Sequence, residues 1–523
     1  MKCRQFAGLA LALGLLLTCF GCGREETEEQ IETQENGTVQ AEVVSDGKFT
    51  LNYTPDAGMN PYTTTSELNR VVGQLVYETL TVVDGTFLVH PGLFSAWSTD
   101  DGIRWTFKVD ASRKFHDGHA MSAADAAYSI QCAKESETYA MRLRHVASAE
   151  PGEEEGTVVV TMDAANTQLP ALLNIPVIGN NTLGMGQPTG TGPYTFSGGG
   201  TTLTVFADHP DAKKMPVETI ELASFPNMED IVNAFSAGTL DLVCNDPTGS
   251  IDLGFGTVSE ARQYATTNLQ YIGFNTNNML FLSAERRAAF TRLIDRAYAV
   301  AVLNDSAVAA TLPFHPVSPY FDEQLAASLT YDPEAGQRAL EKAHIVDYDG
   351  DGQREFLLGE EESSAQDFSL TFLVCSDSTQ KTAVANKIAG DLNALGVTVT
   401  VKSLPWEEYL ASLEAGNFDL YYGEVRLGAD FDLAPLLSPG GALSYGGITN
   451  GAYSEANTAY LSASDTDRAA AAKALLRLVA ENAPIIPVCF EKHEVCAHRG
   501  IVGGFVPTQY NIFSNLPEWV IRI

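Results

Sequence analysis

Apolar and polar positions follow a similar pattern in three segments of the chain after residue 226. In residues 227–243, 380–404 and 405–425, apolar side chains recur at helical spacing, a glycine follows, and a short apolar run comes next. The first period is typical of an amphipathic helix and the short run of a buried strand. Helix–glycine–strand units of this size predict an α/β fold with helices covering the faces of a sheet.

The first half of the chain shows strand-like patterns and one well-marked helix. Residues 81–90 and 103–110 are strand-like, and Asp84-Gly85 is typical of a hairpin turn. Ser122 precedes an amphipathic segment that carries Asp125, a pattern that predicts a capped helix. A long helix over 467–482 and an apolar strand after it are also expected, followed by an aromatic tail that packs back onto the body.

The N-terminus has the pattern of an export signal. Phe6–Phe20 is an apolar run behind a short basic region, too short to cross a bilayer comfortably. The end of this run resembles a bacterial lipobox, with Cys22 as the lipid-bearing cysteine and Cys19 as the alternative. Residues 23–44 are rich in Glu, Thr and Gln and predict a disordered acidic tether. The folded part is expected to begin near Ser45.

The charge excludes some classes of partner. The chain has 32 Lys and Arg against 66 Asp and Glu, a net charge of −34. Such a surface repels nucleic acid and anionic lipid, so no nucleic-acid partner is expected, and it attracts cationic ligands weakly. Five cysteines remain after the tether, and an odd number at scattered spacing is not a disulfide framework.

A family resemblance becomes clear over Phe87–Ile130. The matching positions are Pro91, Leu93, Trp97, Asp101, Gly102, Trp105, Phe107, Phe115, His116, Asp117, Gly118, Ala124 and Asp125. Further blocks follow in the same order, at residues 188–196 ("PTGTGPYTF"), 269–278, 286–300, 331–343 and 481–490. From about Leu51 to the C-terminus the chain resembles the extracytoplasmic solute-binding proteins of peptide- and nickel-type ABC importers.

The resemblance implies a type II periplasmic-binding-protein fold of α/β class, with two lobes, a hinge and an extra insert domain. The implied organisation is a lipoprotein signal peptide at 1–22, the tether at 23–44, a discontinuous first lobe at 45–82, 187–268 and 491–523, the insert at 83–186, and a second lobe at 269–490. The chain is expected to cross between lobes near residues 268–275 and near Phe490, where a hinge would absorb the closing motion.

The implied function is capture of a small solute, such as a peptide, and its delivery to ABC permease subunits served by a separate ATPase. The protein would be monomeric, anchored by lipid to the outer face of the cell membrane or periplasmic, would need no cofactor and would catalyse nothing. Alternatives on the same fold are a nickel or other metal chelate, another amine-bearing solute or a signalling peptide as cargo. A sensory module feeding a membrane receptor also stays open. An extracellular hydrolase is opposed by the lack of a complete catalytic motif.

The resemblance places the ligand's ammonium group at Asp430. Peptide binders of the family hold that group with an aspartate at this position, and Asp432 follows closely. A partly desolvated carboxylate suits an ammonium ion. The family's tryptophan is absent here, because Leu427 occupies its place, and Arg426 brings a cation nearby. A loop carboxylate that faces water or Arg426 is the alternative interpretation of Asp430.

Other candidate ligand contacts rest on position along the chain. They are Asn60, Tyr62, Thr64, Tyr77, Asn275, Trp406 and Tyr422. Loops after strands and aromatic side chains commonly line clefts, and core packing is the competing explanation for each.

Three further stretches contain residues that occur in catalytic or metal-binding sites or in disulfides. His116-Asp117 lacks a nucleophile motif, so a catalytic pair is not expected. "CFEKHEVCAH" is typical of a hairpin or a hinge crossing, and free thiols are the main expectation for Cys489 and Cys496. In a hairpin the two cysteines would face each other, so a disulfide or, with the histidines, a metal site are the alternatives. In "DYDGDGQREF", Asp347, Asp349 and Asp351 resemble the start of a calcium loop.

The twelfth position of that calcium loop is Leu358, where a glutamate is needed, so a tight turn is the main prediction for "DYDGDGQREF" and a calcium site the alternative. No metal is otherwise expected.

Overall fold

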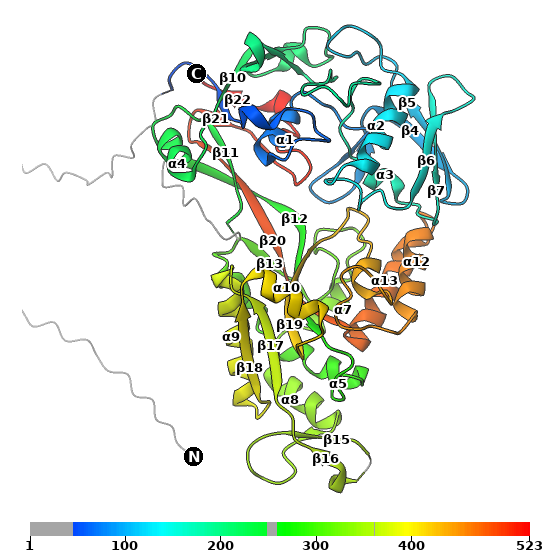
Figure 1. Ribbon diagram of the computed structural model, residues 1–523, viewed down its shortest axis with the longest axis vertical. Helices are drawn as coiled ribbons and strands as arrows, with labels where there is room; N and C mark the ends of the chain where they lie inside the picture. The colour runs from blue at the N-terminus through cyan, green and yellow to red at the C-terminus, as the bar shows by residue number, and fades with distance from the viewer. Residues whose placement is uncertain (1–44, 248–258, 360) are drawn as a thin grey trace, which may run out of the picture. The chain divides into compact units, whose positions relative to one another are not determined.

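A computed structural model describes residues 45–247, 259–359 and 361–523 of the chain (Figure 1). The predicted signal peptide and tether, with Cys19 and Cys22, lie outside these residues. Within the described part, no helix combines the length and the apolar character needed to cross a membrane.

Half of the strands in the described residues belong to one mixed sheet. Its order is β18-β17-β19-β12-β20-β11-β1-β10-β9-β8, with β13 paired to β20 off this path. The bounds are β18 Val399–Leu404, β17 Leu370–Cys375, β19 Leu420–Arg426, β12 Ser259–Phe274, β20 Ile485–His498, β11 Leu242–Asn245, β1 Thr50–Asn52, β10 Thr219–Ala223, β9 Thr202–Val205, β8 Tyr194–Ser197 and β13 Ala307–Ala309. The α/β class predicted from the sequence is confirmed.

Two long strands, β12 and β20, run antiparallel side by side through this sheet (Figure 1). Their pairing is regular from Ser259 to Ala265 and resumes at Leu269, with an irregular register between. Near the N-terminal end of β12 the neighbour of β20 is β11, and near its C-terminal end the neighbour of β12 is β19. The predicted crossings between lobes fall on these two strands, and the domain boundaries stay a prediction.

The three predicted helix–glycine–strand units are present. They are α4 (Met228–Ser236) before β11, α9 (Thr379–Ala394) before β18, and α10 (Trp406–Glu414) before β19. Gly238, Gly396 and Gly416 end the helices with φ of 74°, 80° and 69°, the left-handed region that a residue without Cβ adopts freely. Strand β17 pairs in parallel with both β18 and β19, so α9 and α10 are the crossover connections between parallel strands.

A separate four-stranded antiparallel sheet lies in the first half, in the order β4-β5-β7-β6. Its strands are Phe94–Thr99, Arg104–Val109, Thr157–Met162 and Val146–Pro151. Helix α2 (Ala123–Glu135) packs on it and begins with the predicted cap, in which Ser122 and Asp125 form a reciprocal capping box. Strands β2 (Thr81–Val83) and β3 (Val89–Pro91) form the predicted hairpin.

The other helices are short, apart from a pair near the C-terminus. Their bounds are α1 Glu67–Gly73, α3 Leu169–Leu172, α5 Ala284–Ala289, α6 Arg296–Val302, α7 Glu323–Ala327, α8 Pro333–Lys342, α11 Ala434–Leu437, α12 Ala452–Ser462 and α13 Arg468–Asn482. The remaining strands are β14 Ile345–Val346, β15 Glu355–Leu357, β16 Ala365–Gln366, β21 Val502–Gly503 and β22 Val520–Ile521. The aromatic tail packs back as predicted, since Phe505, Phe513 and Trp519 are buried in the core that contains β1 and α2.

The proposed Cys489–Cys496 disulfide is wrong. The stretch is no hairpin, because both cysteines lie on the single uninterrupted strand β20. Seven residues of strand separate their Cα atoms by about 23 Å, and a disulfide requires about 7 Å or less.

The stretch "DYDGDGQREF" forms the predicted tight turn, between the antiparallel strands β14 and β15. Asp347 accepts hydrogen bonds from the backbone N–H groups of Gly350 and Gly352, at 2.7 and 3.0 Å, and both glycines have positive φ. Asp347, Asp349, Asp351 and Glu355 place carboxylate oxygens within 4.8 Å of one another. The hydrogen bonds within the turn explain the aspartates, and calcium binding there stays a prediction.

Candidate ligand-binding site

A cavity of about 400 Å³ lies where the chain's distant segments meet. It is lined by residues from α1 and the turn after it, from the segment 138–145, from the segment 162–176, from the end of β19 through residue 443, and from the C-terminal tail. Asp430, Asp432, Arg426 and Tyr77 line this cavity, as predicted from the sequence.

Asp430 is a buried carboxylate without a cationic partner. It is 3% exposed and follows β19 in a turn where Phe431 adopts φ of 52°. The Nδ2 amide of Asn166 donates to it at 3.0 Å, and within the described residues no lysine, arginine or histidine forms an ion pair with it. Burial, and then the nearby charge of Asp432, raise the pKa of Asp430 to about 6. A cationic ligand group would supply the missing partner.

Asp432 has a different role, because its charge is already compensated. Its carboxylate pairs with Arg144 and accepts hydrogen bonds from the Asn457 amide at 2.7 Å and the backbone N–H of Ala434 at 2.8 Å. Arg144 comes from the segment after α2, so this ion pair joins the insert region to the segment after β19. Of the two aspartates, only Asp430 offers an uncompensated charge to a ligand.

The cavity also contains arginines, although the chain as a whole is acidic. The Arg142 guanidinium lies 5.4 Å from the Tyr139 ring and 5.7 Å from the Tyr510 ring, and donates to the Asn174 carbonyl at 2.9 Å. Arg426 ends β19 on the same cavity. Neither arginine forms an ion pair with a described residue, whereas Arg70 at the edge pairs with Glu67 at 2.6 Å. The cavity therefore presents one uncompensated carboxylate and two uncompensated guanidinium groups.

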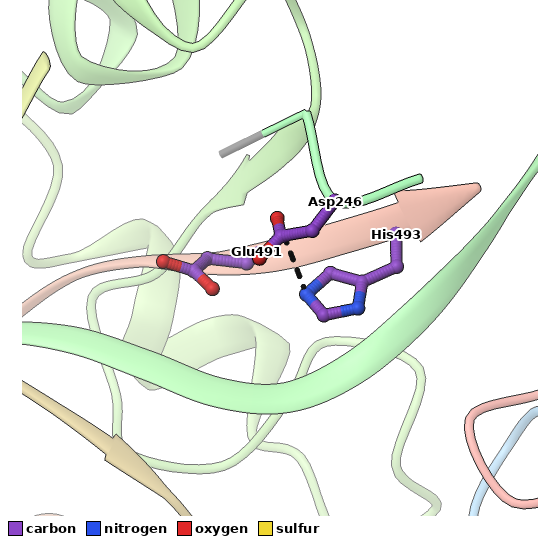
Figure 2. Close-up of side chains that lie close together, drawn as sticks. All are labelled: Asp246, Glu491 and His493. Atoms are coloured by element: carbon purple, nitrogen blue, oxygen red, sulfur yellow. Dashed lines mark ion pairs between the residues drawn. The ribbon is translucent and has the colours of Figure 1, made fainter. Parts of the chain in front are cut away.

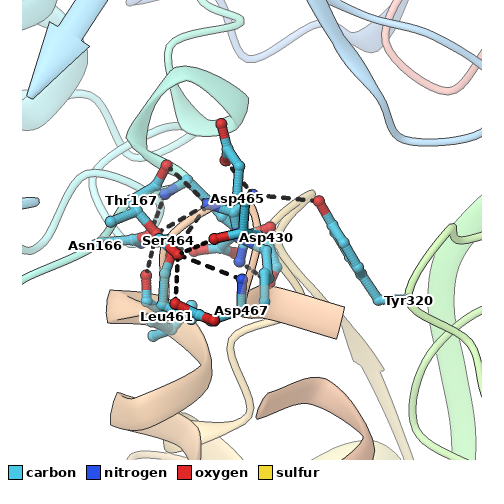
Figure 3. Close-up of polar contacts among 12 residues, drawn as sticks. Asn166, Thr167, Tyr320, Asp430, Leu461, Ser464, Asp465 and Asp467 are labelled. Carbon is cyan, nitrogen blue, oxygen red and sulfur yellow. Dashed lines mark hydrogen bonds and ion pairs between the residues drawn. The ribbon is translucent and has the colours of Figure 1, made fainter. Parts of the chain in front are cut away.

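Hydrogen bonds hold the segment around Asn166 against the segment around Asp430 and helices α12 and α13 (Figure 3). The Tyr460 hydroxyl donates to the Asp430 carbonyl at 3.0 Å. The Thr167 N–H donates to the Leu461 carbonyl at 2.8 Å, and Arg468 donates to the Thr167 hydroxyl at 2.9 Å. This network positions the Asn166 amide on the Asp430 carboxylate.

A second, aromatic cavity of about 300 Å³ adjoins the first and shares Leu443 with it. Trp406, Tyr409, Tyr421, Tyr445 and Tyr271 supply its rings. Two predicted contact residues lie here: Trp406, which is 51% exposed, and Tyr422, whose hydroxyl donates to the side-chain Oε1 of Gln270 at 2.7 Å. This cavity has the size and character to take an apolar side chain of a ligand.

The remaining predicted contacts line neither cavity. The Asn60 amide donates to the Leu183 and Met185 carbonyls, and the Tyr62 hydroxyl donates to the Pro176 carbonyl. Thr64 accepts from the Ser66 N–H, and Asn275 donates to the Phe418 carbonyl. Loop position suggested binding for these four, but their polar groups are used within the fold itself.

The sequence reasoning missed Arg142, Arg144, Asn166 and Tyr510. A signal was present for two of them: "MRLRH" concentrates cationic side chains in a chain with twice as many acidic as basic residues. Asn166 and Tyr510 carry no such signal, because only tertiary contacts bring them to Asp430 and Arg142.

The "FHDG" and "GTGPY" stretches are structural. His116 contacts the Gly192 carbonyl at 3.0 Å, and Asp117 pairs with His119 at 2.5 Å. His116 and Asp117 therefore have different partners and do not pair with each other. Gly190 and Gly192 lie against the backbone after α1, where a Cβ would stand 2.2 Å from the Val76 carbonyl oxygen or 2.5 Å from that of Leu75. The glycines allow this close approach, which places Tyr77 beside the cavity.

Comparisons with known proteins agree with this architecture. Residues 89–440 match the model of the bacterial extracellular solute-binding proteins, family 5 Middle. The oligopeptide-binding protein AppA of Bacillus subtilis is 23% identical over 452 residues, which are 80% of each chain.

Solved structures share the fold. The unliganded periplasmic murein tripeptide-binding protein MppA aligns with a TM-score of 0.73 and 17% identity over 92% of this chain and 99% of its own. NikA from Brucella suis, in complex with Fe(III)-EDTA, aligns with a TM-score of 0.68 and 19% identity over 91% of this chain and all of its own. The two-lobe binding-protein fold expected from the sequence is confirmed. The chain belongs to the bacterial extracellular solute-binding proteins of family 5.

Proposed function

We propose that the protein binds a short zwitterionic peptide and delivers it to the permease of an ABC importer. The observation that carries the proposal is the buried, cation-free carboxylate of Asp430 in a cavity that also holds the unpaired guanidinium groups of Arg142 and Arg426. The peptide α-ammonium would compensate Asp430, and a ligand carboxylate would compensate the arginines. A neutral solute would leave the buried carboxylate of Asp430 unpaired, which is costly.

The protein's relatives support a peptide as cargo. The Bacillus subtilis relative is named an oligopeptide-binding protein, and MppA binds a murein tripeptide. The adjoining aromatic cavity, with Trp406 and Tyr409, supports an apolar side chain near the ligand's ammonium group. The protein would bind and release its ligand without catalysis.

The family and the sequence pattern of the N-terminus support the proposed location of the protein. The protein would be a monomer tethered to the outer face of the membrane by lipid on Cys22 or Cys19. Its permease would be served by a separate ATPase, and ligand binding would favour the permease-competent state.

Calorimetry with matched peptides tests the proposal. Free tripeptides with one aromatic residue should bind, whereas N-acetylated versions of the same peptides should lose at least about 100-fold in affinity, since a charge-assisted pair in a desolvated site is lost. Asp430→Asn should bind free and acetylated peptides equally weakly. Asp347→Asn, in the turn between β14 and β15, is the matched control and should bind as the unmodified chain does. Equal affinity of the unmodified chain for both peptide forms would overturn the role of Asp430.

A further inference from the structure

Three potential metal ligands, Asp246, Glu491 and His493, lie close together beside β20 (Figure 2). Glu491 and His493 are two residues apart on β20, so their side chains project on the same side. The pairing of Asn245 with Glu494 brings the next residue of that segment, Asp246, opposite His493. One ligand atom from each of the three side chains lies within 4.8 Å of the other two.

The contact between His493 and Asp246 has the spacing of two ligands of one ion. The Nε2 of His493 lies 3.4 Å from Oδ1 of Asp246. This nitrogen is buried, yet it forms no hydrogen bond in the part of the chain that the structure describes. Two ligands at about 2.1 Å from a tetrahedral ion lie about 3.4 Å apart. The geometry suits a shared cation better than a direct hydrogen bond.

Glu491 is oriented by a second layer of polar groups. It is 2% exposed, and its two carboxylate oxygens accept hydrogen bonds from the Gln270 amide at 2.6 Å and the Asn268 amide at 3.1 Å. Each oxygen has a second lone pair available. Amides that hold a carboxylate in this way are typical of the groups behind metal ligands.

The surrounding charge favours a cation. The negative charges of Asp246, Glu424 and Glu67 act electrostatically on the His493 imidazole, and the positive charge of Arg426 opposes them. Lys381 is the other nearby cation, and it pairs with Glu424. Asp246, Glu491, Glu424 and Glu67 outnumber these two cations.

We propose that Asp246, Glu491 and His493 bind a divalent transition-metal ion of the zinc type, with water completing its coordination. One imidazole nitrogen and two carboxylate oxygens form a ligand set that Zn²⁺ and Co²⁺ accept. The ion would tie the segment after β11 to β20 beside the irregular register of β12 and β20, and so stiffen the crossing between the lobes. It is a resident ion and not the cargo.

Titration of the full chain, freed of metal with a chelator and without peptide, tests the site. Zn²⁺ should bind at one equivalent, and His493→Gln should weaken it at least about tenfold. Asn268→Ala, which removes a positioning amide, should weaken it by a smaller factor. Asp351→Asn, in the exposed acidic turn, is the control and should leave this equivalent of zinc unchanged. Unaltered Zn²⁺ affinity in His493→Gln would overturn the proposal.

A Co²⁺ titration of the unmodified chain distinguishes this site from the neighbouring cysteines. Because the titration uses no variant, it does not depend on whether a variant folds. Co²⁺ at the proposed site should give weak visible bands and no intense thiolate-to-cobalt band. A thiolate band at one equivalent would assign the ion to Cys244 or Cys496 and overturn the proposal. Peptide binding is measured separately, so failure of the proposed cargo and failure of the metal site are distinguishable.

Discussion

The Asn166 amide donates a 3.0 Å hydrogen bond to the Asp430 carboxylate, and this is the bond that ties the segment after β7 to the centre of the cavity. The bond compensates part of a buried negative charge and leaves the rest for a ligand. It lowers the pKa of Asp430, while burial and Asp432 raise it more.

Peptide affinity should depend on pH through Asp430. The ammonium group needs the ionised carboxylate, and the pKa of Asp430 is raised to about 6. Affinity should therefore be constant between about pH 7 and the ligand's amine pKa near 8, and fall about tenfold per unit below pH 6. Calorimetry at pH 5, 6 and 7.5 measures this. Constant affinity across this range would exclude Asp430 as the ammonium partner.

Asp430→Asn should bind peptide poorly without losing stability. The folded-state pKa is raised, so the carboxyl contributes stability below its unfolded value near 3.9, and this contribution is lost as pH rises through about 6. An isosteric amide removes the uncompensated charge. The ligand-free variant should melt at or above the temperature of the unmodified chain at pH 7.5, and the difference should shrink toward pH 4. A clearly lower melting temperature at pH 7.5 would contradict this.

Arg144→Met should destabilise the protein by about 1–3 kcal/mol, because it leaves the carboxylate of Asp432 buried without its cation. The estimate is at the lower end for buried pairs, since Arg144 is partly exposed. Urea unfolding measures the change. Arg338→Met is the control: its pair with Glu334 is exposed on α8 and should contribute about 0–0.5 kcal/mol. Equal effects of the two variants would show that the Arg144 pair does not stabilise the fold.

Two glycine-to-alanine changes should act in opposite directions. A Cβ at Gly273 would stand 2.1 Å from the buried Tyr421 ring on the paired strand, so Gly273→Ala should lower the stability by about 1–3 kcal/mol. Gly390 lies inside α9 with no atom near its added Cβ, so Gly390→Ala should raise the stability by about 0.5–1 kcal/mol. Thermal unfolding of both variants checks the pair. A stable Gly273→Ala would mean that Tyr421 moves aside easily.

The elements were largely predictable because their signals are local. The strict alternation of apolar and polar residues predicts β5. Ser122 with Asp125 predicts the start of α2, and Gly396 predicts the end of α9. Local patterns gave a wrong prediction where the same residues are compatible with two local structures, a turn and a strand. "CFEKHEVCAH" has the polar content of a turn, yet pairing with β12 on one side and β11 on the other keeps it extended through Cys496.

The binding site was predictable only in part. Asp430 was identified from a family motif, and its burial, its pKa and its lack of a cation depend on Asn166 and Asp432 and on packing that no sequence period encodes. Asn60 and Tyr62 were candidates by position along the chain alone, and their polar groups are bonded to the fold's own carbonyls.

The sequence by itself determined the α/β class, the family, the order of most elements and the acidic, exported character of the chain. These depend on periodicity, turn residues and composition, which are properties of neighbouring residues. Only the tertiary structure decided which charges stay uncompensated. Arg144 neutralises Asp432 and leaves Asp430 for a ligand, and the pairing of β11 with β20 brings Asp246 to Glu491 and His493. Charge compensation and ligand geometry depend on contacts between residues hundreds of positions apart, and folding alone creates those contacts.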